Sequence, residues 1–263
     1  MNIYKHTILL LFINFLGFKT FSYATFSIIA IDLHTNESGA ALGTCYTKQF
    51  KIYTTKLNIN LADYVVLENN GFGIMNLQSD INDFTPIWLS TAKGILAQDE
   101  PYYTAKVISK FLTQPNQDYK HKDRQILLLK KDKYNNITSE IYHGENVTNF
   151  KAGKIRLHID DRFSIATAGN YMTNTHAPEI MEKAFIAAEG NLSDKLIAAL
   201  NSIGLTNDLG DSRCRTSEGV SANYAFLRTF QNGKIKLDLN ITTDEEEQEA
   251  TSLLKEKYEF LQE

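Results

Sequence analysis

Apolar runs separated by turn residues predict strands in the first part of the chain. Residues 25–31 are apolar and rich in β-branched side chains, and residues 39–46 are small or apolar. Residues 32–38 between them have the composition of a turn, so the two runs are expected to form a hairpin. A second hairpin is expected from residues 64–67 and 72–77, which are joined by an Asn-Gly turn.

A helical spacing of apolar residues follows these hairpins and returns later in the chain. Apolar side chains repeat at this spacing after Pro86 and after Pro101, which predicts a pair of helices. A second pair is expected at 178–188 and 192–203, and a final helix at 243–260 with acidic residues in its first turn. Further strands are predicted at 124–130, 137–143, 163–168, 220–230 and 234–241, with a polar loop at 205–219.

The order of these elements predicts the fold class. Hairpins alternate with helix pairs along the chain, and this order suits two antiparallel sheets with helices on their outer faces. A doubly wound parallel sheet would alternate single strands with single helices, so it is not expected. The sequence therefore predicts an α+β layered sandwich.

Residues 1–24 have the layout of a signal peptide. An apolar run at 7–18 lies between basic residues, and Ser22 and Ala24 are the small residues that signal peptidase requires before its cut. The alternative is a membrane anchor, but a spanning helix needs about 20 apolar residues. Cleavage after Ala24 predicts a mature chain of residues 25–263 that is exported, periplasmic or secreted, without a membrane partner.

The composition agrees with one ordinary globular domain. Of the 263 residues, 43% are hydrophobic and 22% are charged, and no internal repeat or linker divides the chain. The formal net charge of −4 provides no basic footprint, so nucleic acid is not expected as a partner. Cys45 and Cys214 are too few for a disulfide framework or a zinc site. In an oxidising compartment they either pair or remain as two small buried residues.

Motifs of several common enzyme classes are missing from the sequence. It has no Gly-x-Ser-x-Gly elbow, no phosphate-binding loop of the Walker type, no Gly-x-Gly-x-x-Gly after a strand and no His-Glu-x-x-His. The six histidines are scattered, without the spacing of metal ligands. We therefore expect neither a metal nor a cofactor.

Thr25 is the residue with a specific chemical possibility. Cleavage after Ala24 would give it a free α-amine, and a terminal amine with a pKa of about 7.7 to 8.0 can act as a base near neutral pH. One residue would then carry both a nucleophile and its base. The structural alternative is that Thr25 is only the first residue of a strand, where threonine is common.

Several segments together resemble a bacterial family known as domain of unknown function 1028, which is considered similar to N-terminal-nucleophile hydrolases. The resemblance extends from Thr25 to the final helix. It rests on Thr25-Phe-Ser-Ile-Ile-Ala-x-Asp32, Ser38-Gly-Ala-Ala-Leu-Gly43, Arg124-Gln125, Gly169-Asn170, Gly210-Asp-Ser-Arg213 and Leu237-Asp-Leu239.

The resemblance implies a four-layer αββα sandwich with Thr25 at the position of the nucleophile. Gly169 and Asn170 follow a predicted strand and could supply a backbone N–H and a side-chain amide to an oxyanion, or form a turn. Asp211 and Arg213 could orient the Thr25 amine or hold a substrate carboxylate, or form a structural ion pair.

Two further polar residues complete the set of candidates. Gln78 is a possible hydrogen-bonding residue for substrate. Asp32 is expected to cap the first turn of the chain.

The sequence also departs from the family pattern. Leu77 stands where the family tends to have threonine before Gln78, and the segment that starts at Asn240 replaces a more charged run. The prediction is an exported hydrolase of an amide or related acyl bond in a small-molecule or peptide-like substrate. The departures favour the alternative, a non-catalytic module that binds peptides or cell-wall fragments.

Overall fold

The computed structural model describes residues 25–46, 60–78, 85–147, 150–206, 208–217, 219–243 and 248–263. The predicted signal peptide lies outside the described residues. Among the described residues, no helix is long and apolar enough to cross a membrane.

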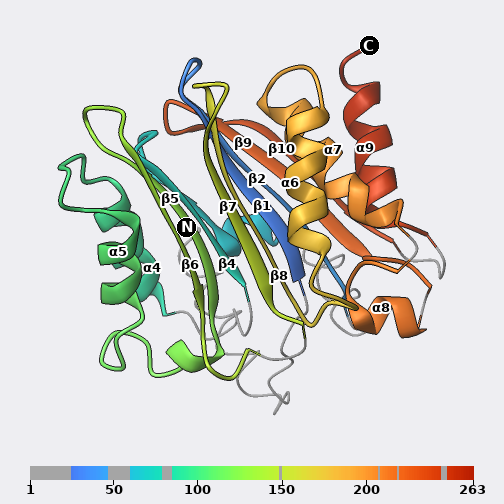
Figure 1. The fold of residues 1–263 in the computed structure, drawn as a ribbon, viewed down its shortest axis with the longest axis horizontal. Helices are drawn as coiled ribbons and strands as arrows, with labels where there is room; N and C mark the ends of the chain where they lie inside the picture. Colours follow the sequence, from blue (N-terminus) through green and yellow to red (C-terminus); the bar gives the residue numbers. More distant parts are fainter. Residues whose placement is uncertain are drawn as a thin grey trace, which may run out of the picture.

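The larger of two antiparallel sheets has β1 near its middle (Figure 1). Its strand order is β10-β9-β2-β1-β8-β7, so β1 pairs with β2 on one side and β8 on the other. The strands are β1 (Thr25–Asp32), β2 (Glu37–Thr44), β7 (Ala152–Ile159), β8 (Phe163–Asn170), β9 (Tyr224–Gln231) and β10 (Lys234–Thr242).

The smaller sheet is also antiparallel and has the order β3-β4-β5-β6. Its β4 and β5 are paired so that Gln78 lies opposite Gln125, and β6 continues this row with His143. The strands are β3 (Val66–Glu68), β4 (Gly73–Gln78), β5 (Gln125–Lys131) and β6 (Ile137–His143).

Helices cover the outer face of each sheet. Side chains of α4 and α5 join the core of the smaller sheet, and those of α6, α7 and α9 join the core of the larger sheet. In Figure 1 the two groups lie on opposite sides of the strands. The helices are α3 (Ala62–Val65), α4 (Pro86–Leu96), α5 (Ala105–Leu112), α6 (Ala177–Ala187), α7 (Leu192–Gly204), α8 (Ser212–Ser217) and α9 (Ala250–Phe260), with a 3-10 turn at His121–Asp123.

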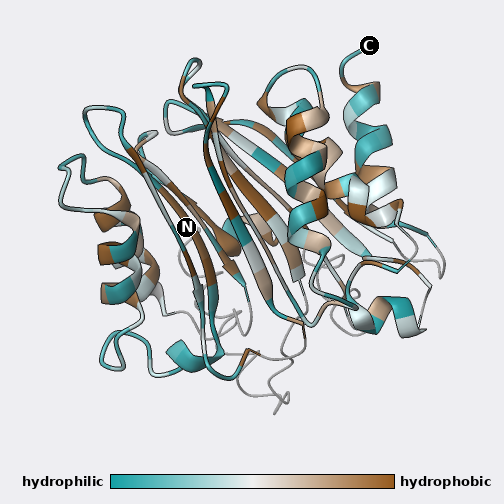
Figure 2. Cartoon of the chain, viewed as in Figure 1, coloured by the Kyte–Doolittle hydropathy of each residue, from teal (hydrophilic) through white to brown (hydrophobic). Residues whose placement is uncertain are grey.

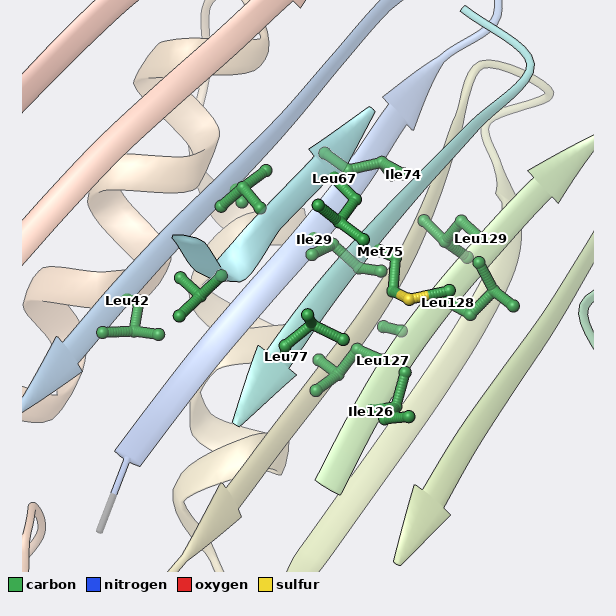
Figure 3. Close-up of a cluster of buried hydrophobic side chains, with 14 of the residues drawn as sticks. Ile29, Leu42, Leu67, Ile74, Met75, Leu77, Ile126, Leu127, Leu128 and Leu129 are labelled. Carbon is green, nitrogen blue, oxygen red and sulfur yellow. The ribbon is translucent and has the colours of Figure 1, made fainter. Parts of the chain in front are cut away.

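The hydrophobic core lies between the two sheets and under the helices. Apolar side chains of both sheets meet in the first region, as Figure 3 shows for Ile29, Leu42 and Leu127. In Figure 2 the strands carry many brown residues, and the helices beside them carry both brown and teal residues. Because side chains alternate along a strand, Ile28 instead faces the helices and joins the second cluster. Thr25 and Ser27 share the face of Ile29 and therefore point toward the smaller sheet.

Local signals at the helix ends explain where the helices begin. Thr85 and Thr104 cap α4 and α5, since each side chain accepts a hydrogen bond from a backbone N–H three residues later. Asn191 and Asp194 form a capping box at the start of α7.

The structure confirms the predicted α+β class and its two antiparallel sheets, with five local differences. Strand β9 begins at Tyr224 instead of residue 220. Residues 62–65 form α3, which shortens the strand predicted at 64–67. Strand β7 and helix α8 were not predicted. Helix α9 begins at Ala250 instead of Thr243, and its N-cap is the side chain of Glu249. The acidic residues expected in its first turn, 244–246, lie outside the described residues.

Candidate functional site

Thr25 is the first residue of β1 and lies between two polar residues of the neighbouring strands. In the register of the sheet it is opposite Thr44 on β2 and Asn170 on β8. The Thr25 and Thr44 hydroxyl oxygens are 3.5 Å apart. Cross-strand neighbours on one face have Cβ atoms about 5 Å apart, so the side chains of all three meet at this end of the inter-sheet layer. Thr25 is only 4% exposed in the uncleaved chain.

Three buried amide side chains connect the sheets beside Thr25. Asn170 Nδ2 donates to Gln125 Oε1 at 2.7 Å and to Gln78 Oε1 at 3.2 Å. Gln125 Nε2 donates to the carbonyl of Gly169 at 3.1 Å, and Gln78 Nε2 donates to the hydroxyl of Ser27. Gln78, Gln125 and Asn170 are almost completely buried, so this network replaces water as their hydrogen-bond partner.

A single backbone carbonyl fixes the direction of every hydrogen bond in this network. The Gly169 oxygen can only accept, so it requires the amide nitrogen of Gln125. Gln125 must then present its oxygen to Asn170, and Asn170 must present its nitrogen to both glutamines. The amide of Gln78 is ordered in the same way, with its nitrogen toward Ser27.

One acceptor at the centre of the site is left over. Asn170 Oδ1 is buried and has no hydrogen-bond partner within the described part of the chain. Both hydrogens of Asn170 Nδ2 are donated to glutamines. The expected donation from this amide to an oxyanion would therefore need the network to rearrange. Asn170 Oδ1 is instead an unused acceptor on the residue opposite Thr25 in the sheet.

His143 extends the network to the edge strand of the smaller sheet. Its Nδ1 lies 2.8 Å from Gln125 Nε2. Because Gln125 presents an N–H here, Nδ1 accepts and the ring proton is on Nε2. Desolvation lowers the pKa of His143 below its ordinary value of 6.5, and the positive charge of Lys151 adds to this effect.

Asp211 and Arg213 form a buried ion pair near the same end of the sheet. The Asp211 carboxylate accepts from Arg213 Nη2 at 2.7 Å and Nε at 3.1 Å, and from the backbone N–H groups of Arg213 and Cys45. Burial raises the pKa of Asp211, while Arg213 and the N–H of Cys45 act against the increase. Cys45 directly follows Thr44, so the structural role of this ion pair is to hold the end of β2.

The segment after β8 is held against the Asp211 loop. Tyr171 has a left-handed φ of 51°, which is uncommon for a residue other than glycine. Its carbonyl accepts from the N–H of Ser212 at 3.1 Å, and Met172 forms a β-bridge with Asp211. Gly210 has a φ of 128°, and a Cβ there would lie 2.5 Å from Ser221 Cα.

A disulfide closes this part of the molecule. Cys45 at the end of β2 is bonded to Cys214 in α8, with Cα atoms 5.5 Å apart. Of the two alternatives that the sequence left open, the structure has the bridge. The disulfide and the Asp211 ion pair therefore connect α8 to the strand that carries Thr44.

The structure brings together the candidates Thr25, Gln78, Gly169 and Asn170. Asp211 and its partner Arg213 lie next to this group, because Asp211 accepts a hydrogen bond from the backbone N–H of Cys45, the residue after Thr44. Gln78 is buried and both ends of its amide are used within the protein. Asp32 lies at the opposite end of β1, where it accepts from the backbone of His34 and Thr35 and pairs with Arg162. It caps the turn as predicted.

Four residues of the site were not among the sequence candidates: Ser27, Thr44, Gln125 and His143. Strand pairing is the signal that could have found Thr44, Gln125 and His143, and the alternation of side chains along β1 places Ser27 on the face of Thr25. Thr44 is opposite Thr25, and Gln125 is opposite both Gln78 and His143. No group of three or more His, Cys, Asp or Glu side chains in the described ranges could hold a metal ion.

Comparison with known proteins gives a family match and a structural likeness. Residues 25–250 match the model described as Family of unknown function (DUF1028). The fold is similar to the crystal structure of protein SPO2555 from Silicibacter pomeroyi, a DUF1028 protein, with 16% sequence identity and a TM-score of 0.63. The likeness covers 91% of this chain and 90% of that chain. At this identity it shows the fold alone. No curated protein matches the chain.

Proposed function

The chain belongs to the DUF1028 family, a family of unknown function, and from that premise we propose that it is an exported hydrolase whose nucleophile is Thr25. Its substrate would be a small-molecule or peptide-like compound with an amide or related acyl bond. The observation that carries the proposal is the position of Thr25. It starts a central strand and lies opposite a buried amide that has an acceptor to spare.

Removal of residues 1–24 would create the base. The free α-amine of Thr25 would take the proton from the hydroxyl, whose oxygen attacks the acyl carbon and forms a tetrahedral oxyanion. The C–N bond would break as the ammonium returns its proton to the leaving amine. Water, deprotonated by the same amine, would then hydrolyse the acyl-enzyme ester and release the acid.

Asn170 supports this mechanism through its unpaired oxygen. An ammonium or amine at residue 25 is a donor, and Asn170 Oδ1 is a buried acceptor on the cross-strand neighbour. A buried acceptor without a partner costs roughly 1–3 kcal/mol. The new terminus would satisfy it, and the amine would be held beside its own hydroxyl.

The backbone N–H of Gly169 remains our proposed oxyanion donor. Arg213 is only partly buried, so one side of its guanidinium can reach substrate while Asp211 holds the other. Under this proposal the two sheets and their outer helices constitute the αββα sandwich of N-terminal-nucleophile hydrolases, which the family resemblance implied.

Mass spectrometry of the exported protein tests the first step. The expected mature N-terminus is Thr25, and any other N-terminus removes the proposed base. A panel of amide and ester substrates should then be tested with the verified mature protein. Thr25→Ala should abolish hydrolysis, while Thr25→Ser, which keeps the hydroxyl and the amine, should retain part of it. Thr229→Ala is the matched control, because this buried threonine of β9 lies outside the site and its hydroxyl has no hydrogen-bond partner within the described residues.

The second candidate is a non-catalytic exported module that binds peptides or cell-wall fragments. The 4% exposure of Thr25 favours it, because a nucleophile must reach its substrate. A structure of the mature protein separates the two functions. Catalysis requires that the Thr25 hydroxyl be open to solvent after cleavage, whereas a hydroxyl that stays covered supports binding.

A further inference from the structure

Among the groups that order the amides around Asn170, the Ser27 hydroxyl can donate or accept and follows Gln78, and His143 is the one that can gain a proton. The Gly169 carbonyl always accepts, and the amide groups cannot ionise. His143 can change: a neutral ring accepts at Nδ1, but a protonated ring donates from both nitrogens. It therefore has two states that differ in what they require of Gln125.

Protonation of His143 conflicts with the rest of the network. The new Nδ1–H would face the Nε2–H of Gln125 at a heavy-atom distance of 2.8 Å in the present geometry. Turning the Gln125 amide over would remove this clash, but it would place Oε1 against the Gly169 carbonyl and Nε2 against Asn170 Nδ2. Relief at His143 thus requires Asn170 to turn as well, and Gln78 must turn with it because Asn170 Nδ2 also donates to Gln78 Oε1. The Ser27 hydroxyl can then donate to Gln78, whereas the contact between Gln125 Oε1 and the Gly169 carbonyl stays unfavourable.

A turned Asn170 would no longer present its free Oδ1 acceptor opposite Thr25. Its Oδ1 would move toward Gln125 and its Nδ2 toward the position where the free acceptor now lies. The Thr25 amine would then face a donor instead of an acceptor. A proton at the edge strand β6 is in this way coupled to the first residue of β1 through two amide groups.

From this geometry we infer that His143 is a positioning residue that, in its neutral form, holds Asn170 Oδ1 ready for the Thr25 amine. The inference rests on the proposed function for its effect on catalysis, but the coupling within the network does not. His143 contacts Gln125 and does not touch Thr25, so it acts through the amides.

Few groups compete with the network for control of His143. Gln125 faces it from β5, and Gly153 of β7 lies close to its Nε2, where an added Cβ would be 3.3 Å away. Asn170 and Gly169 on β8 are uncharged. Within the described part of the chain, Lys151 is the charged residue that acts on the ring, and it favours the neutral form.

Two substitutions separate the two properties of His143: its hydrogen-bond acceptor and its ability to gain a proton. His143→Asn keeps an acceptor oxygen on Cγ, where Nδ1 now lies, and cannot be protonated. His143→Leu removes the acceptor. His158→Asn, at an exposed histidine of β7, is the control for removing a histidine elsewhere.

The decisive measurement is NMR of the side-chain amides of Gln125 and Asn170 as the pH is lowered. In the wild type and in His158→Asn, both signals should shift with the same midpoint as the His143 ring. They should stay constant in His143→Asn. In His143→Leu they should differ from the wild type at neutral pH. Amide signals that do not follow His143, or that are unchanged in His143→Leu, would overturn the inference.

Kinetics then connect the network to Thr25. If mature protein hydrolyses a substrate, kcat/KM of the wild type should fall at acid pH with the His143 midpoint, and His143→Asn should lack this decrease. His143→Leu should lose about fivefold at neutral pH, the effect of one neutral hydrogen bond. Responsive amides in a protein without Thr25-dependent hydrolysis would contradict the proposed function alone. Hydrolysis that depends on Thr25 but not on His143 would contradict the positioning role alone.

Discussion

Two buried asparagines, Asn170 and Asn76, differ in whether their side-chain amides are hydrogen-bonded. Asn170 has both amide hydrogens bonded, whereas neither Nδ2 nor Oδ1 of Asn76 has a partner within the described residues. Asn76 lies on β4, two residues from Gln78 on the same face, and is fully buried. The chain therefore carries the cost of desolvating this amide without a compensating hydrogen bond.

Replacing Asn76 by leucine should stabilise the protein. The two side chains have the same number of heavy atoms, and an unpaired buried amide costs roughly 1–3 kcal/mol. The free energy of unfolding should rise by about that amount, measured by urea denaturation with the fluorescence of Trp88, the single tryptophan. Asn76→Asp, which buries a charge in the same shape, should be strongly destabilising. A loss of stability in Asn76→Leu would mean that the amide is bonded in solution, for example to a water molecule.

At the residue scale, the sequence predicted which candidates gather but not how they are bonded. Gly169 and Asn170 are the last two residues of β8, which extends the strand predicted at 163–168, so their position near Thr25 depended only on strand pairing. The bonding of Asn170 depends on how the two sheets face each other, because Gln78 and Gln125 come from the smaller sheet. No local pattern contains that information.

At the element scale, α8 depends on covalent and polar contacts more than on packing. It has six residues, and Cys214 is its only residue in a buried apolar cluster. The Arg215 side chain donates to backbone carbonyls of the loops on both sides of α8, and Cys214 carries the disulfide to β2. Such a short helix has little stability of its own.

Removing the disulfide should therefore loosen α8 first. Cys45→Ala with Cys214→Ala should lower the free energy of unfolding by about 2–5 kcal/mol. Hydrogen exchange should accelerate in α8 and at the backbone N–H of residue 45, but not in α7. A reducing agent should lower the melting temperature of the wild type and leave the double variant unchanged. Equal exchange in α8 with and without the bridge would show that the polar contacts suffice.

Strand β7 and helix α8 were not predicted, and the reasons differ. In β7, Lys154, Arg156 and His158 alternate with apolar residues, so the period of a strand is present. It is an edge strand with much of its surface exposed, and its apolar content is lower than that of β1 or β8. Helix α8 has no apolar period, because a disulfide and the Arg215 side chain hold it in place. Periodicity could have found the first but not the second.

At the scale of the whole molecule, the buried His143 makes stability depend on pH. Its folded pKa is below its unfolded value of about 6.5, so the unfolded chain binds this proton first as the pH falls. The contribution of neutral His143 is complete above the unfolded pKa and is lost as the pH falls through the folded pKa.

Urea denaturation of the wild type and of His143→Asn over this pH range checks the expectation. The wild type should lose stability more steeply than the variant below about pH 6.5. The difference between the two curves should become constant once the pH lies below the folded pKa. Parallel curves throughout would show that the histidine titrates equally in the folded and unfolded states.

The central position of β1 also decides how the protein should be prepared. Thr25 is held on both sides by β2 and β8, so any residue added before it would have to leave the sheet beside Thr44 and Asn170. An affinity tag at this end would occupy the candidate site, and an initiator methionine retained there would do the same. The last residues, 261–263, are exposed beyond α9 and can carry a tag without touching either sheet.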